Sequence, residues 1–121
     1  MARSSRAEKL LALSPDERRE QIARMNHGQR KRLLPYWRLW AHDGQVAPAD
    51  GWHTWLLMAG RGYGKTRAGA EWVREIAEND PTARIALVGA SLGEARRVMV
   101  EGESGLLAIS RPKKRPLYEP S

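Results

Sequence analysis

A glycine-rich segment in the middle of the chain holds the residues best suited to bind a phosphate group. These residues are Gly60, Arg61, Gly62, Tyr63, Gly64, Lys65 and Thr66. Glycine lets backbone amides approach an anion closely and adopts positive φ angles without steric cost. A lysine at the start of the next helix can reach the β and γ phosphates of a nucleotide, and a neighbouring hydroxyl can bind magnesium. Lys65 and Thr66 occupy these two places, so the spacing predicts a phosphate-binding loop of the Walker A type.

The segment departs at one position from the standard pattern, G-x-x-x-x-G-K-[ST], because Ala59 stands where that pattern has its first glycine. The alternative interpretation is a glycine-rich turn with an incidental lysine and threonine. We favour the phosphate loop because an apolar run precedes the segment and an amphipathic pattern follows it, which is the context this motif requires. Arg61 has two interpretations as well: a solvated loop charge, or a cation that stabilises charge on the γ phosphate during phosphoryl transfer.

The elements that must position this loop follow from the hydrophobic pattern. Residues 52–59 and 83–88 are short apolar runs that predict buried strands, and residues 65–78 have the periodicity of an amphipathic helix. A capping box at Ser91 and Glu94 predicts a helix that ends near Val100, and a short helix is expected near residues 104–109. This order predicts an α/β fold, a βαβ unit of the P-loop NTPase type with an incomplete parallel sheet.

A helical leader, residues 1–42, is predicted before a linker at residues 43–51 and the βαβ unit at residues 52–121. Capping boxes that begin at Ser5 and Ser14 predict helices near residues 6–12 and 15–26. Residues 26–28, Asn-His-Gly, are expected to end the second helix. Trp37 and Trp40 stand beside arginines and could stack on bases or on adenine, but packing inside the protein is the favoured interpretation.

Positive charge is concentrated in the leader. Residues 1–42 contain ten Lys and Arg against four Asp and Glu, whereas residues 43–121 contain eleven against ten. A second, smaller cluster lies in a tail that is expected to be irregular, at Arg111, Lys113, Lys114 and Arg115. Such segments suit a polyanion such as nucleic acid, and a solvated helix face is the alternative of equal weight.

The composition limits the remaining classes. The chain has 121 residues, a formal net charge of +7 and no cysteine, which allows one domain and excludes a disulfide scaffold or a cysteine zinc site. No apolar run approaches the roughly 18–20 residues of a membrane span. The first residues are not followed by the apolar core of an export signal, so export and membrane insertion are not expected.

Residues 52–74 resemble the start of the ATPase domain of the large terminase subunit, the DNA-packaging motor of tailed bacteriophages and gene transfer agents. The similarity continues through residues 85–91, 97–109 and 115–121. The resemblance implies an ATP-driven motor that moves double-stranded DNA into a preformed capsid, joined in the whole protein to a nuclease domain. It also implies the portal and the small terminase subunit as partners, a homo-oligomer of the full-length protein, and a cytoplasmic location at the procapsid.

The resemblance assigns roles to the loop residues. Terminases have a variant phosphate loop that contains an arginine, which makes Ala59 and Arg61 expected departures and Arg61 a catalytic candidate. Lys65 would bind the β and γ phosphates of ATP, Thr66 would bind Mg²⁺, and the amides of residues 62–66 would bind phosphate oxygens. Motor ATPases contact adenine with residues upstream of this loop, and Gln45 and Trp52 are the candidates there.

The acidic residues of a complete ATPase are missing from the pattern. A magnesium-organising acid at the end of a later strand and a second acid that activates water are needed, yet the residues after Thr66 contain no strand that ends in Asp-Glu. Glu101 and Glu103 are interpreted as solvated, and the nuclease acids are absent as well. We therefore expect a terminase fragment without the Walker B part that hydrolyses ATP poorly. The alternative is a basic DNA- or partner-binding fragment without a competent nucleotide site.

Overall fold

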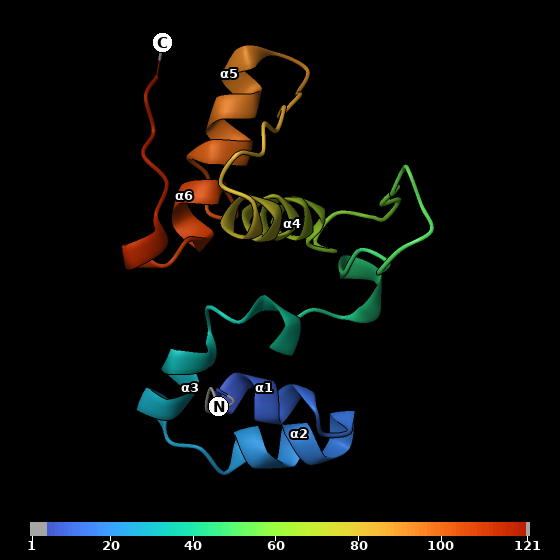
Figure 1. Cartoon of the computed structure of the whole chain (residues 1–121), viewed down its shortest axis with the longest axis vertical. Coiled ribbons are helices and arrows are strands. Elements are labelled where there is room, and N and C mark those ends of the chain that lie inside the picture. Colours follow the sequence, from blue (N-terminus) through green and yellow to red (C-terminus); the bar gives the residue numbers. More distant parts are fainter. Residues whose placement is uncertain (1–4, 121) are drawn as a thin grey trace. The chain divides into compact units, whose positions relative to one another are not determined.

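Helices and irregular segments make up the computed structural model, which describes residues 5–120 (Figure 1). The chain divides into two units, residues 1–42 and residues 43–121, which we call the leader unit and the loop unit. Residues 1–4 of the predicted leader and residue 121 of the predicted tail lie outside the described residues. None of the helices in the described range combines the length and the apolar character that a membrane span requires.

The leader unit is built from three short helices and a 3-10 turn. They are α1 (Arg6–Leu11), α2 (Pro15–Ala23), α3 (His27–Leu33) and η1 (Trp37–Leu39). The helices α1 and α2 begin at the two predicted capping boxes. A third capping box, formed by Asn26 and Gln29, begins α3. The prediction that residues 26–28 end the second helix is therefore wrong, because α2 ends at Ala23 and Asn26 is the N-cap of the next helix.

At the carboxyl end of each leader helix, backbone carbonyls accept hydrogen bonds from a side chain that follows later in the chain. Arg18 of α2 donates to three carbonyls at the end of α1 at 3.0–3.2 Å. Arg30 of α3 donates to two carbonyls at the end of α2 at 2.8 and 3.2 Å. The Trp40 indole N–H donates to the Leu33 carbonyl of α3 at 3.0 Å. These side chains add a hydrogen bond to carbonyls at or just after the ends of the helices, several of which also accept a backbone N–H.

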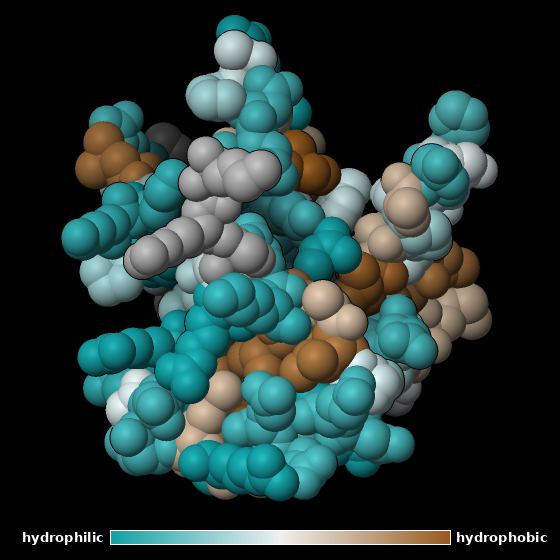
Figure 2. Space-filling model, turned by 60° about the horizontal axis from the view of Figure 1, so that its bottom comes forward, coloured by the Kyte–Doolittle hydropathy of each residue, from teal (hydrophilic) through white to brown (hydrophobic). Residues whose placement is uncertain are grey.

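A small apolar core lies between the leader helices. Its buried members are Ala7, Leu10, Met25, Leu33 and Leu39. Hydrophilic side chains cover most of the face of this unit that is seen in Figure 2, with apolar side chains between them. The leader is therefore held together by few buried side chains and by the hydrogen bonds at its helix ends.

The loop unit contains one long helix, α4 (Lys65–Asn79). The shorter helical segments are η2 (Asp43–Gln45), α5 (Leu92–Glu94), η3 (Ala95–Val100), α6 (Leu106–Ile109) and η4 (Pro112–Lys114). The amphipathic pattern predicted α4 correctly, and its buried residues include Ala68 and Ala70. The helix α5 begins at its predicted cap, Ser91, and continues directly into η3, which is π-helical. Both α6 and η3 contact α4.

The predicted parallel sheet, and with it the α/β βαβ fold, is wrong. No strand is present among residues 5–120, and no backbone hydrogen bond joins the extended segments 52–59 and 83–88. Leu56, Met58 and Val88 are 72%, 83% and 81% exposed rather than buried. A run of apolar residues predicts only that a segment can be buried, and it does not predict that the segment forms a strand. A strand also requires a neighbouring segment that pairs with its N–H and C=O groups, and these two segments are not paired.

Candidate phosphate-binding site

Two glycines give the predicted phosphate loop its shape. Gly62 has a φ of 80° and Gly64 a φ of 88°, in the left-handed region that other residues rarely adopt. Gly64 is the N-cap of α4, and its carbonyl accepts the Ala68 N–H at 2.9 Å. Residues 60–62 are exposed. An open, glycine-rich turn therefore leads directly into the free amides at the amino end of a 15-residue helix, where anions bind favourably.

Lys65 is the first residue of α4, and its ammonium group lies on the backbone of the loop. The Lys65 Nζ donates to the carbonyl of Gly60 at 3.0 Å and to the carbonyl of Ala59. The contact with Ala59 is made by its backbone carbonyl and therefore does not require a glycine at this position. Thr66 is exposed, and its hydroxyl has no hydrogen bond within the described residues. The structure thus brings the predicted lysine, hydroxyl and glycines together in one loop.

Gln45 is hydrogen-bonded to the backbone at the end of this loop. Its side chain is only 7% exposed, and its Nε2 donates to the carbonyl of Tyr63 at 2.9 Å. A Cβ atom on Gly64 would collide with the same amide group. The sequence had offered Gln45 as a candidate contact for adenine, whereas the structure places its amide on the loop backbone. A side chain at position 64 would therefore be opposed by the φ angle and would have to displace the Gln45 amide from the Tyr63 carbonyl.

Residues 56–121 match the family model described as the amino-terminal part of the terminase large subunit, T4-like virus type. This chain belongs to that terminase family. The matched residues include the whole phosphate loop and all of α4, so the resemblance seen in the sequence is confirmed. The family supports a role in viral DNA packaging, with DNA and phage packaging components as general partners. No curated protein matches the chain, and no solved structure matches it.

An ion-pair network runs along the terminase helix α4 behind the loop. The Glu71 side chain is 1% exposed, and its carboxylate accepts from Arg67 and from Arg74 at 2.9 Å each. Arg74 also donates to Glu78 at 2.8 Å. Burial disfavours the charged form of Arg74, but the hydrogen bonds and charges of Glu71 and Glu78 outweigh burial and raise the pKa of Arg74. The sequence spacing predicts the i,i+4 pairs Arg67–Glu71 and Arg74–Glu78, and both are confirmed. The burial of Glu71 and its i,i+3 pair with Arg74 were not predicted.

Three tryptophans pack together between the segment before the loop and α4. The ring centroids of Trp52, Trp55 and Trp72 lie 6.1–6.5 Å apart, within the range of favourable aromatic pairs. The Trp52 indole N–H donates to the Pro48 carbonyl at 2.7 Å. Trp52, the second candidate for adenine contact, is thus already used to attach residues 48–55 to α4.

Three further residues to which the sequence assigned a role are exposed to solvent. Arg61 is exposed and makes no hydrogen bond or ion pair with the rest of the described chain. Glu101 and Glu103 are exposed, as the sequence predicted. Within residues 5–120 no group of three or more His, Asp or Glu side chains is arranged to hold a metal ion, so Thr66 remains the predicted magnesium ligand.

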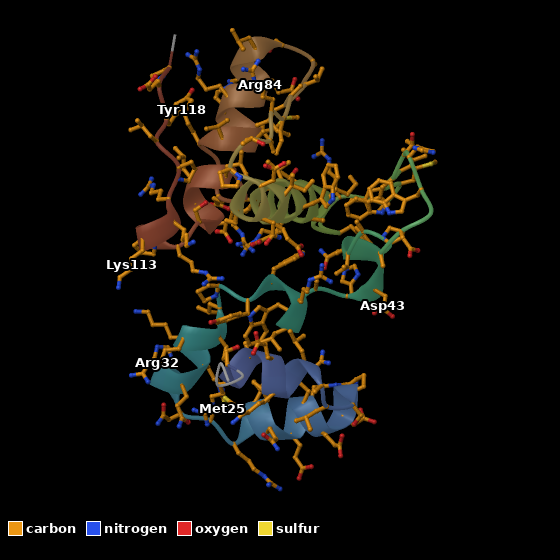
Figure 3. The ribbon with its side chains drawn as sticks, in the orientation of Figure 1. Met25, Arg32, Asp43, Arg84, Lys113 and Tyr118 are labelled. Carbon is orange, nitrogen blue, oxygen red and sulfur yellow. The ribbon has the colours of Figure 1, made fainter. Side chains whose placement is uncertain are left out.

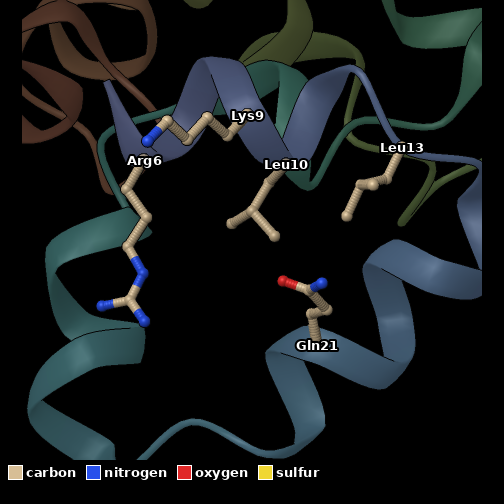
Figure 4. Close-up of a pocket in the computed structure, with 5 residues that line it drawn as sticks. All are labelled: Arg6, Lys9, Leu10, Leu13 and Gln21. Carbon is tan, nitrogen blue, oxygen red and sulfur yellow. The ribbon is translucent and has the colours of Figure 1, made fainter. Parts of the chain in front are cut away.

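The structure has a cavity beside the phosphate loop and another in the leader unit. One, of about 400 Å³, lies beside the loop and has Lys65 and Thr66 at its polar part, with α4, residues 86–88 and apolar side chains of η3 and α6 as its walls. The other, of about 530 Å³, lies in the leader unit (Figure 4). It is lined by Arg6, Lys9, Leu10, Leu13 and Gln21. Of these two cavities, only the first is lined by residues of the predicted site.

Proposed function

We propose that the loop of residues 60–66 binds the phosphates of ATP together with Mg²⁺, and that this chain carries the nucleotide site of a terminase motor. The observation that carries the proposal is the position of Lys65. Its ammonium group lies on the loop carbonyls at the first turn of α4, where the helix amides also favour negative charge.

The donors present fit a magnesium nucleotide. The Lys65 ammonium would bind the β and γ phosphates, the amides of residues 62–66 would bind phosphate oxygens, and the exposed Thr66 hydroxyl would bind the metal. When bound, Mg²⁺ neutralises phosphate charge and helps to stabilise the charge that develops during phosphoryl transfer. Arg61 is exposed at the edge of the loop, where its guanidinium can turn toward a γ phosphate.

The proposed motor function also implies binding partners. Family membership supports DNA packaging in general, and we propose double-stranded DNA as the cargo, with the portal and the small terminase subunit as protein partners of a homo-oligomeric full-length motor. The proposed phosphate and metal contacts all lie in residues 60–66, and the described residues contain no group of three or more His, Asp or Glu side chains that could hold a metal ion. We therefore expect the isolated chain to bind nucleotide and to hydrolyse it poorly.

Titration of the chain with a fluorescent ATP analogue in Mg²⁺ tests the nucleotide site. Lys65→Ala should lower the affinity at least tenfold, because a charge-assisted contact to phosphate contributes about 1.5–3 kcal/mol. Lys31→Ala removes an exposed lysine of α3 and should leave the affinity unchanged. Equal affinity in the parent chain and in Lys65→Ala would reject the nucleotide site and favour a basic DNA- or partner-binding fragment.

A further inference from the structure

Four cationic side chains lie close together in the loop unit, outside the phosphate-binding loop. They are Arg111, Lys113, Lys114 and Arg115. Residues 104–118 contain no Asp or Glu, and the acids that flank this range are Glu103 and Glu119. We call residues 111–116 the basic turn.

The basic turn has a defined backbone. Its 3-10 helix, η4, is closed by a hydrogen bond from the Lys114 N–H to the Arg111 carbonyl at 2.9 Å. Pro112 and Pro116 stand on either side of the lysines, and proline fixes the backbone φ angle. A turn restricted in this way loses little conformational entropy when it binds a partner.

Both ends of the basic turn are attached to the rest of the loop unit. On the amino-terminal side, Ile109 is buried and the Ser110 hydroxyl donates to the Leu106 carbonyl at 2.6 Å. On the carboxyl-terminal side, Tyr118 lines a recess of about 210 Å³ together with Leu87 and other residues of the unit. Figure 3 shows the Lys113 side chain pointing away from the helices of this unit. The tip of the turn is thus exposed to solvent, next to a segment that is packed into the loop unit at Ile109.

The cations at the tip of the turn are not used inside the protein. Lys113, Lys114 and Arg115 are exposed, and none has a hydrogen bond or ion pair within the described part of the chain. In the leader unit, by contrast, Arg18 and Arg30 donate to helix carbonyls. The charges of Lys113, Lys114 and Arg115 are therefore available to an external anion.

We propose that the basic turn binds the phosphate backbone of duplex DNA, at a surface separate from the phosphate-binding loop. Duplex DNA carries one negative charge per about 1.7 Å of its axis, so adjacent cations on one turn meet more than one phosphate. Contacts of this kind position a protein on DNA without reading its sequence. The inference rests on the DNA-packaging role proposed above and names the surface that serves it.

Fluorescence anisotropy of a labelled 30-base-pair duplex, titrated with the full chain over a series of salt concentrations without nucleotide, tests the inference. The double variant Lys113→Gln/Lys114→Gln should lower the slope of log K against log salt by about 2, because each phosphate contact contributes about 0.9. At low salt its affinity should fall about tenfold or more for duplexes of any sequence. Lys113→Arg/Lys114→Arg keeps the charge and should keep the parent's slope.

A matched control removes two other cations from the same unit. Arg84 and Arg97 are exposed and lie outside the basic turn, and Figure 3 places Arg84 well apart from Lys113. Arg84→Gln/Arg97→Gln should change the slope by less than half as much. Equal changes in the two double variants would show that only total charge matters and would overturn the inference, as would a parent chain that does not bind the duplex. Far-UV circular dichroism checks that the variants keep their helices. Because nucleotide is absent, failure here is distinct from failure of the Lys65→Ala test.

Discussion

The three glycines of the phosphate loop differ in what their backbone and surroundings require. Gly64 combines a φ of 88° with the close approach of the Gln45 amide, Gly62 has a φ of 80° with open space around its Cα, and Gly60 has neither constraint. A left-handed backbone costs a residue with a Cβ about 1–2 kcal/mol. A collision with a buried side chain adds to this cost.

Alanine substitutions should therefore destabilise the loop in a fixed order. Gly64→Ala should cost more than about 2 kcal/mol and Gly62→Ala about 1–2 kcal/mol, whereas Gly60→Ala should stay within about 0.5 kcal/mol. Amide hydrogen exchange of Ala68, whose N–H makes the first backbone hydrogen bond of α4, and of the residues that follow it measures this local stability. Adding Gln45→Ala to Gly64→Ala should recover part of the loss, because it removes the collision. An equal cost at all three positions would contradict this description of the loop.

Glu71 is a buried charge that is stabilised by two arginines. Its carboxylate is almost completely shielded from water and accepts hydrogen bonds from Arg67 and Arg74. Removing one member of a buried ion pair leaves the others without compensation, which costs about 3–5 kcal/mol. Glu78, whose side chain is 25% exposed, pairs with the same Arg74 from the edge of the network.

Glu71→Gln should accordingly lower the stability of α4 by about 3 kcal/mol, which corresponds to roughly a hundredfold loss of amide protection in that helix. Glu78→Gln is the matched control and should cost at most about 1 kcal/mol, because its ion pair is partly solvated. Similar protection in the two variants would mean that Glu71 has no special role in holding α4.

At the scale of elements, capping boxes determine where the leader helices begin. Each box is contained in four consecutive residues, which is why Ser5 and Ser14 identified α1 and α2 from sequence. The box of α3 uses Asn26 and Gln29, and the glycine between them suggested a helix end instead. The amphipathic pattern of residues 65–78 likewise predicted α4 correctly. The strands failed because pairing depends on segments distant in sequence, which the pattern of one segment does not contain.

Glu17 makes the capping box of α2 sensitive to pH. Hydrogen bonds from the Ser14 side chain and from the Ser14 backbone lower the pKa of Glu17 from its ordinary value of 4.5. Because the folded pKa lies below the unfolded one, this contribution to stability is present above about pH 4.5 and is lost as the pH falls through the folded pKa.

Glu17→Gln should remove that pH dependence and keep the cap, since an amide oxygen accepts the same hydrogen bond, as Gln29 does in α3. Between about pH 5 and pH 2 the parent's α2 should lose more amide protection than the α2 of the variant, compared at each pH. Glu20→Gln changes an exposed ion pair with Arg24 and serves as the control. The assignment fails if Glu17→Gln retains the parent's full loss on acidification.

At the scale of the whole molecule, the sequence predicted the glycine-rich turn and the helix α4 better than the architecture around them. Residues 60–66 are contiguous, so their spacing alone identified the loop that the structure shows between Ala59 and α4. The hydrogen bond from Gln45 to Tyr63 joins residues 18 positions apart, and no local sequence pattern predicts such a contact. The family match begins at residue 56 and therefore describes the loop unit without the leader.

The closing of each leader helix by the next element has a consequence for synthesis on the ribosome. The carbonyls of α1 receive Arg18, those of α2 receive Arg30, and that of Leu33 receives Trp40. All of these groups are translated before residue 43, and each helix is completed by a side chain that follows it within one short segment. The leader can therefore fold in the order of translation and be complete before the phosphate loop leaves the exit tunnel.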